Sequence, residues 1–207
     1  MGYYPVVVEM TGRATAVIGG GTVAERKVKG LLDAGAAVTV ISPCLTAQLA
    51  RWLKRARISH IARNYAPGDL AGYELAFVAT DDPRVNIAVF SDARERRLWI
   101  NSADDPAHCD FILPSVLRRG DLTVAVSTGG KSPALSRLIR HELDQYISRQ
   151  HEALAKVVAG VRKELRRRAI KPSSTAWQKA LNGQVRGLVE RGELDSAKRY
   201  LLEQLGV

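Results

Sequence analysis

A glycine-rich stretch near the N-terminus, residues 14–27 (ATAVIGGGTVAERK), strongly limits what this chain can fold into. Gly19, Gly21 and Ala24 fit the pattern G-x-G-x-x-G/A. In that pattern the first glycine permits a tight turn, the second lets the backbone approach a pyrophosphate, and the third small residue lets helix and strand pack closely. The stretch therefore predicts a strand, a phosphate-binding turn and a helix whose free N–H groups face the phosphates. A turn whose glycines serve the backbone alone is the alternative.

Strand and helix patterns alternate after this turn. Gly35 is placed to end the first helix, and the apolar run that follows reads as a buried strand. Further strands are predicted at residues 58–61, 75–79 and 99–100, and helices at 45–57 and 85–96. Residues 3–8 are either an edge strand or a chain start laid over this domain. The alternation indicates an α/β fold with a Rossmann-like, doubly wound parallel sheet.

A different pattern begins near residue 111. Two apolar segments around the basic turn at 118–121 predict a hairpin, and the turn at 127–133 opens a helix with Ser132 as its N-cap. The GKS triplet is not an ATP-binding P-loop, because Ala125 stands where that motif requires glycine. A glycine-rich turn before a helix can still bind a carboxylate through backbone N–H groups, and a plain capped helix start is the alternative.

The formal net charge of +10 is unevenly distributed. Residues 151–207 hold 12 Lys and Arg against 6 Asp and Glu, in amphipathic helical patterns that predict a compact helical unit. Such a charge attracts nucleic acid, anionic lipid or a polycarboxylate metabolite, unless the basic residues are only solvated helix faces. No apolar run approaches the roughly 20 residues of a membrane span, and no signal peptide is recognisable. With two distant cysteines that suit a reducing compartment, the chain is predicted to be soluble and cytoplasmic.

Polar residues follow the predicted strands at the edge where ligands bind in open α/β sheets. Thr80 and Asp81 follow one strand, and Asn101 and Asp104 follow the next. Asp104 is the candidate acid–base residue, since its carboxylate could reach a substrate lying against a bound dinucleotide. A simple Asp-Pro turn at residues 105–106 is the alternative reading of this loop.

Two other features carry less information. The second strand is followed by Ser42, Pro43 and Cys44 instead of the acidic residue that usually holds a ribose, so local residues do not choose between NAD and NADP. The trio at residues 108–110 (HCD) lacks any usual zinc spacing, and no metal site is predicted.

Five segments, taken together, resemble the precorrin-2 dehydrogenase module of siroheme synthases. They are residues 19–27, 79–82, 101–104, 111–115 and 124–133. The likeness covers about residues 3–150 in unbroken order and continues more loosely into the helical tail. It is to the stand-alone form of the module, which also occurs as a bifunctional dehydrogenase and ferrochelatase.

The resemblance implies NAD-dependent oxidation of precorrin-2 to sirohydrochlorin by a homodimer. It implies an NAD-binding domain at 1–113, a dimerisation and substrate-site segment at 114–150, and a basic helical domain at 151–207. Asp104 falls on the family's proposed acid–base aspartate. The expected cofactor contacts are Gly19, Gly20, Gly21, Thr22, Val23, Ser42, Pro43, Cys44, Thr80 and Asp81. The expected substrate contacts are Asn101, Ser127, Thr128, Gly129 and Lys131.

Other functions stay open at this level. No residue separates members that also insert ferrous or cobaltous ion from those that only dehydrogenate. A non-catalytic NAD-sensing module would bind the nucleotide without turning over any tetrapyrrole. A nucleic-acid-binding protein would show affinity that falls steeply with salt, although nucleic acid and membrane are not the expected partners.

Overall fold

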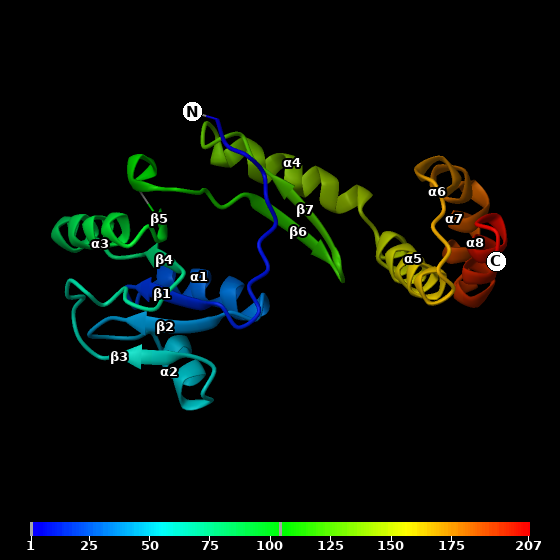
Figure 1. The fold of residues 1–207 in the computed structure, drawn as a ribbon. Helices are drawn as coiled ribbons and strands as arrows, with labels where there is room; N and C mark the ends of the chain where they lie inside the picture. The colour runs from blue at the N-terminus through cyan, green and yellow to red at the C-terminus, as the bar shows by residue number, and fades with distance from the viewer. Residues whose placement is uncertain (1, 104) are drawn as a thin grey trace. The chain divides into compact units, whose positions relative to one another are not determined.

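The structure is a computed structural model that describes residues 2–103 and 105–207. It divides into two compact units, Met1–Leu113 and Pro114–Val207, whose helices and strands are drawn in Figure 1. Each unit has a hydrophobic core of its own. The division into three segments expected from the sequence stays a prediction.

The first unit is built on a parallel sheet of five strands in the order β3-β2-β1-β4-β5. Its strands are β1 (Ala14–Ile18), β2 (Ala37–Ile41), β3 (Ser59–Ile61), β4 (Leu75–Val78) and β5 (Trp99–Ser102). Its helices are α1 (Thr22–Asp33), α2 (Ala47–Lys54), α3 (Pro83–Glu95) and the short 3-10 helix η1 (Pro106–His108). Ile18 pairs with Ile41 on one side and Val78 on the other, so β1 and its glycine turn are central. The doubly wound parallel sheet predicted from the sequence is confirmed.

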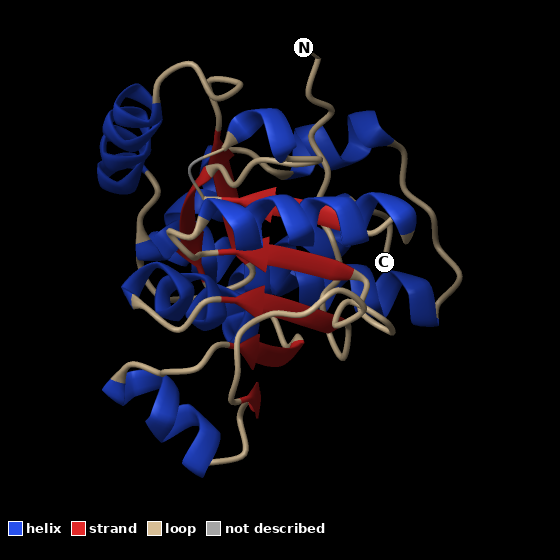
Figure 2. Ribbon diagram, turned by 90° about the vertical axis from the view of Figure 1, so that its left-hand side faces the viewer, coloured by secondary structure: helices blue, strands red, loops and turns tan. Residues whose placement is uncertain are grey.

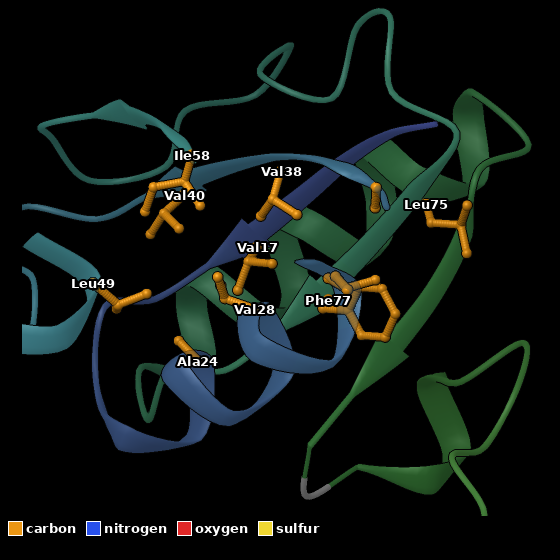
Figure 3. Close-up of a cluster of buried hydrophobic side chains, with 11 residues drawn as sticks. Val17, Ala24, Val28, Val38, Val40, Leu49, Ile58, Leu75 and Phe77 are labelled. Carbon is orange, nitrogen blue, oxygen red and sulfur yellow. The ribbon is translucent and has the colours of Figure 1, made fainter. Parts of the chain in front are cut away.

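Alternate residues of β1 enter two different cores, because successive side chains of a strand point to opposite faces of the sheet. Val17 packs with Val28 of α1 and Leu49 of α2 on one face (Figure 3). Ile18 packs with Val89 of α3 on the other face. Helices therefore cover both faces of the sheet, as Figure 2 shows with strands in red and helices in blue. This burial on both faces explains why the central strands read as continuous apolar runs.

Two local predictions change. Residues 3–8 pair with no strand in the described chain, and Tyr4 and Val7 are 87% and 97% exposed, so the edge-strand interpretation is wrong. The helix expected at 45–57 is shorter, because the Thr46 hydroxyl accepts a hydrogen bond from the Leu49 N–H and so begins the helix at Ala47.

The second unit begins with an antiparallel hairpin of β6 (Ser115–Arg119) and β7 (Leu122–Val126). Its helices are α4 (Pro133–Tyr146), α5 (Arg149–Arg167), α6 (Ser174–Ala180), α7 (Gly183–Glu190) and α8 (Leu194–Gln204). Helix α4 begins as predicted, because Ser132 accepts a hydrogen bond from Leu135 N at 3.2 Å. Val161 of α5 and Leu201 of α8 are fully buried in the core that joins α5 to α8.

The apolar stripe of α4 is not buried within its own chain. Leu135 and Leu138 are 45% and 54% exposed, and the buried residue of this helix is Ser136. Helical periodicity identifies an apolar face, but it does not say whether that face is buried.

Candidate functional site

The glycine turn lies where the carboxyl ends of three strands meet. Gly19 has φ +115°, and a Cβ there would lie 2.1 Å from the carbonyl oxygen of Ala79 at the end of β4. A Cβ at Gly20 would lie 1.8 Å from the carbonyl oxygen of Cys44 and 2.7 Å from the Oγ of Ser42, after β2. Only glycine therefore fits at these two positions.

The start of α1 is open. A Cβ at Gly21, the N-cap residue, would meet nothing within 4 Å. Within residues 2–103 and 105–207, no acceptor is paired with the backbone N–H of Thr22 or Val23. Free N–H groups at the positive end of a helix bind phosphate. These residues thus fit the pyrophosphate of a dinucleotide.

The segment after β2 is held against this turn. The Ser42 hydroxyl donates to the Cys44 carbonyl oxygen at 2.8 Å, and Thr46 N donates to the Gly20 carbonyl oxygen at 3.0 Å. The neighbouring His60 ring contacts the Ser42 carbonyl oxygen at 2.8 Å. The structure thus brings Ser42 and Cys44, two of the expected cofactor contacts, to the glycine turn.

A small pocket of about 100 Å³ lies at the carboxyl ends of β4 and β5. It is lined by Val23, Ala79, Thr80, Asp81, Asn86, Ser102, Ala103 and Asp105. It brings together three expected cofactor contacts, Val23, Thr80 and Asp81, with Asn86 of α3, which the sequence analysis missed. The Asn86 Oδ1 atom is buried and has no hydrogen-bond partner in the described chain. An unpaired buried acceptor costs about 1–3 kcal/mol.

Asn101 ties β5 to its surroundings. Its Oδ1 accepts a hydrogen bond from Lys27 Nζ at 2.7 Å, and its Nδ2 donates to the Phe111 carbonyl oxygen at 2.9 Å. The Lys27 ammonium also lies 5.3 Å from the centre of the Phe77 ring. The sequence analysis assigned no role to Lys27, and no sequence signal links it to a partner 74 positions away.

The loop after β5 contains Asp104, which lies outside the described residues. Beyond it, the Cys109 thiol accepts a hydrogen bond from Ser102 N at 3.1 Å and donates to the Asp105 carbonyl oxygen at 3.3 Å. Burial raises the pKa of this thiol. The Asp105 carboxylate is paired with the His108 ring, and that hydrogen bond lowers the pKa of the Asp105 carboxyl. These hydrogen bonds connect Ser102, Asp105, His108 and Cys109 to one another.

Residues 108–110 do not converge on one point. His108 contacts Asp105, Cys109 bonds to backbone groups, and Asp110 forms an ion pair with Arg94 at 2.7 Å. In the part of the chain that the structure describes, no three His, Cys, Asp or Glu side chains are grouped to hold a metal ion.

The remaining expected substrate contacts lie in the second unit, in the turn before α4. The Thr128 hydroxyl accepts from Ser132 N at 2.9 Å and donates to the Ser132 carbonyl oxygen at 3.1 Å. Ser127 Oγ accepts from Gly129 N at 3.1 Å, and Lys131 is exposed. These bonds stabilise the turn itself, and a role in substrate binding stays a prediction. Asn101 belongs to the other unit.

Residues 6–115, more than half of the chain, match a family model described as putative NAD(P)-binding. The chain belongs to this family. Residues 119–146 match a second model, described as sirohaem biosynthesis protein central. Every helix of the described chain is too short or too polar to span a membrane.

Several curated relatives cover nearly the whole chain. A siroheme synthase of Photorhabdus laumondii is 36% identical over 99% of this chain and 44% of the relative. A siroheme synthase of Nitrosomonas eutropha is 38% identical over 99% of this chain and 44% of the relative. The chain thus spans less than half the length of these relatives.

A solved structure of SirC, precorrin-2 dehydrogenase, aligns with a TM-score of 0.79 at 26% identity and covers 98% of both chains. The resemblance to siroheme synthases and precorrin-2 dehydrogenases, stated from the sequence motifs, is confirmed.

Proposed function

We propose that this chain is an NAD-dependent dehydrogenase that oxidises precorrin-2 to sirohydrochlorin in siroheme synthesis. The observation that carries the proposal is the open N-terminus of α1 after a turn in which Gly19 and Gly20 leave no room for a side chain. The pocket beside this turn, at the ends of β4 and β5, adds room for the reacting half of the dinucleotide. The alignment with SirC supports the choice of substrate.

The chain's own residues have three tasks in this reaction. The N–H groups of Thr22 and Val23 bind the pyrophosphate, and the pocket orients the nicotinamide half. Asp104 takes the proton that leaves precorrin-2, and NAD⁺ held by these residues would supply the acceptor for the hydride. The basic residues of 151–207 attract the carboxylates of the tetrapyrrole.

Anaerobic turnover of precorrin-2 with NAD, followed by NADH absorbance, tests the activity. We expect Asp104→Ala to lower kcat at least about a hundredfold, because general acid–base catalysis contributes that much or more. The dissociation constant for NAD should not change. Asp33→Ala is the control, since among the described residues Asp33 pairs with exposed Lys29 alone, at the far end of α1. Turnover of Asp104→Ala at the wild-type rate would exclude Asp104 as the base.

Absence of NADH formation despite nucleotide binding would instead favour a non-catalytic NAD sensor. Ferrous or cobaltous ion added after NADH formation tests metal insertion in the same sample, through a further spectral change that depends on the metal.

We also propose that the exposed face of α4 and the hairpin binds a second copy of the chain. Leu135 and Leu138 lie three positions apart on α4 and are 45% and 54% exposed, and Val116 of the hairpin is 39% exposed. Uncovered apolar side chains of this kind mark an interaction surface. A carboxylate buried in such an interface would have no partner. Leu138→Asp should therefore weaken dimerisation at least about a hundredfold in sedimentation equilibrium. Leu53→Asp, at an exposed position of α2 in the other unit, should leave the dimer dissociation constant unchanged. Equal effects of the two substitutions would contradict the proposed dimer surface.

A further inference from the structure

Asn86 is held at the pocket by the first turn of α3. Asp82 caps this helix by accepting a hydrogen bond from Arg84 N at 2.9 Å, and Asn86 N donates to the Asp82 carbonyl oxygen at 3.1 Å. The Asn86 side chain lines the pocket, and its Oδ1 is the one buried side-chain N or O atom without a partner among the described residues. Proteins seldom leave such an atom unpaired, so a donor that is not among the described residues is expected, and the pocket beside Asn86 is open to a ligand that supplies one.

The chemistry of the missing donor is restricted. An amide oxygen only accepts hydrogen bonds. Ionised carboxylates of a tetrapyrrole and ionised phosphates of a dinucleotide also only accept, so neither can pair with it. The groups of NAD that donate are the nicotinamide carboxamide, the ribose hydroxyls and the adenine amine.

The position of the pocket narrows this choice. The glycine turn and the start of α1 fit the pyrophosphate at the centre of the dinucleotide. The pocket lies on the side of β4 and β5, while Ser42 and Cys44 flank the turn on the side of β2. In a dinucleotide fold the two nucleoside halves lie on opposite sides of this switch point. A volume of about 100 Å³ exceeds the ~30 Å³ share of a single water several times, which leaves room for part of a ring.

We propose that Asn86 recognises the carboxamide of nicotinamide, with Oδ1 accepting a hydrogen bond from the carboxamide NH₂. A small rotation about the soft terminal torsion of the asparagine side chain, well short of exchanging Oδ1 with Nδ2, uncovers the buried oxygen to the ligand. Asn86 is then a residue that positions the ring and selects the cofactor by its amide group. The inference rests on the proposed NAD-dependent function.

The test is calorimetric binding of three ligands to the wild type and to Asn86→Leu. The ligands are NAD, its 3-acetylpyridine analogue, in which a methyl group replaces the NH₂, and ADP-ribose, which lacks the ring. The wild type should bind NAD about tenfold more tightly than the analogue, as for one hydrogen bond worth ~1.4 kcal/mol. Asn86→Leu should bind the two equally and should bind ADP-ribose as the wild type does. Asn64→Leu makes the same change at an exposed position that does not line the pocket and should keep the tenfold preference.

Each outcome decides a different point. If Asn86→Leu keeps the tenfold preference for NAD over the acetylpyridine analogue, the carboxamide contact is wrong. If Asn86→Leu loses as much affinity for ADP-ribose as for NAD, the contact is also wrong, and a ribose hydroxyl is the partner instead. If the wild type binds none of the three ligands, the proposed NAD-dependent function is wrong, and the inference about Asn86 is wrong with it. Ligand-free Asn86→Leu should melt no lower than the wild type, because an unpaired acceptor has been removed. Asn86→Ser replaces it in the same assay if the leucine does not fold.

Discussion

Alanine at Gly19 should cost the first unit about 2–5 kcal/mol of its free energy of unfolding, and alanine at Gly20 about 1–3 kcal/mol. The added Cβ would meet the carbonyl oxygens of Ala79 and Cys44 at 2.1 and 1.8 Å, and these backbone atoms belong to the ends of the central strands. Overpacking of this kind costs about 1–3 kcal/mol, and at Gly19 the left-handed backbone adds about 1–2. Chemical denaturation of the purified variants measures the loss.

Gly21→Ala is the matched comparison. A Cβ at this position meets nothing within 4 Å, so the variant should stay within about 1 kcal/mol of the wild type. Its affinity for NAD should nevertheless fall, because the methyl group occupies the approach of the pyrophosphate. Equal stability losses at Gly20 and Gly21 would contradict the geometry of this turn.

Asp92→Ala should destabilise the first unit by about 3–5 kcal/mol. Asp92 is only 5% exposed and accepts hydrogen bonds from Tyr65 OH at 2.5 Å, Gly68 N at 2.9 Å and Arg96 Nε at 2.5 Å. Removing the carboxylate leaves these donors, one of them charged, without a partner. Asp33→Ala, which breaks only an exposed ion pair, should cost less than about 1 kcal/mol in the same denaturation experiment. Similar losses for the two variants would show that the buried network contributes little.

The same carboxylate predicts a pH dependence. Burial opposes ionisation of Asp92, but the hydrogen bonds from Tyr65, Arg96 and Gly68 outweigh it and lower the pKa below the ordinary value. Its contribution to stability is therefore complete above the unfolded pKa of about 3.9 and is lost as pH falls toward the folded value. The difference in unfolding free energy between the wild type and Asp92→Asn should shrink below pH ~4. A constant difference down to pH 3 would contradict the lowered pKa.

Local sequence signals predicted what depends on local geometry. The turn at Gly19 and the cap at Ser132 follow from residue types at fixed spacing, and both are confirmed. The pairing of Lys27 with Asn101 was not predictable, because it joins α1 to β5 across 74 positions. Asn86 was missed for a similar reason, since one polar residue in a helical pattern does not reveal the pocket that two distant strand ends create. Asp104 stays a prediction that rests on its position after β5 and on the family motif at residues 101–104.

Helix α1 has a consequence that reaches beyond phosphate binding. Its first turn offers the N–H groups of Thr22 and Val23. Its second turn carries Lys27, which donates a hydrogen bond to Asn101 near the end of β5. A single helix, α1, therefore positions both the pyrophosphate of a dinucleotide and the first residues of the loop that follows β5. A displacement of about 1 Å between reacting groups can cost a hundredfold in rate. Because both groups are fixed to the same helix, a change that shifts α1 should alter cofactor binding and the position of β5 together.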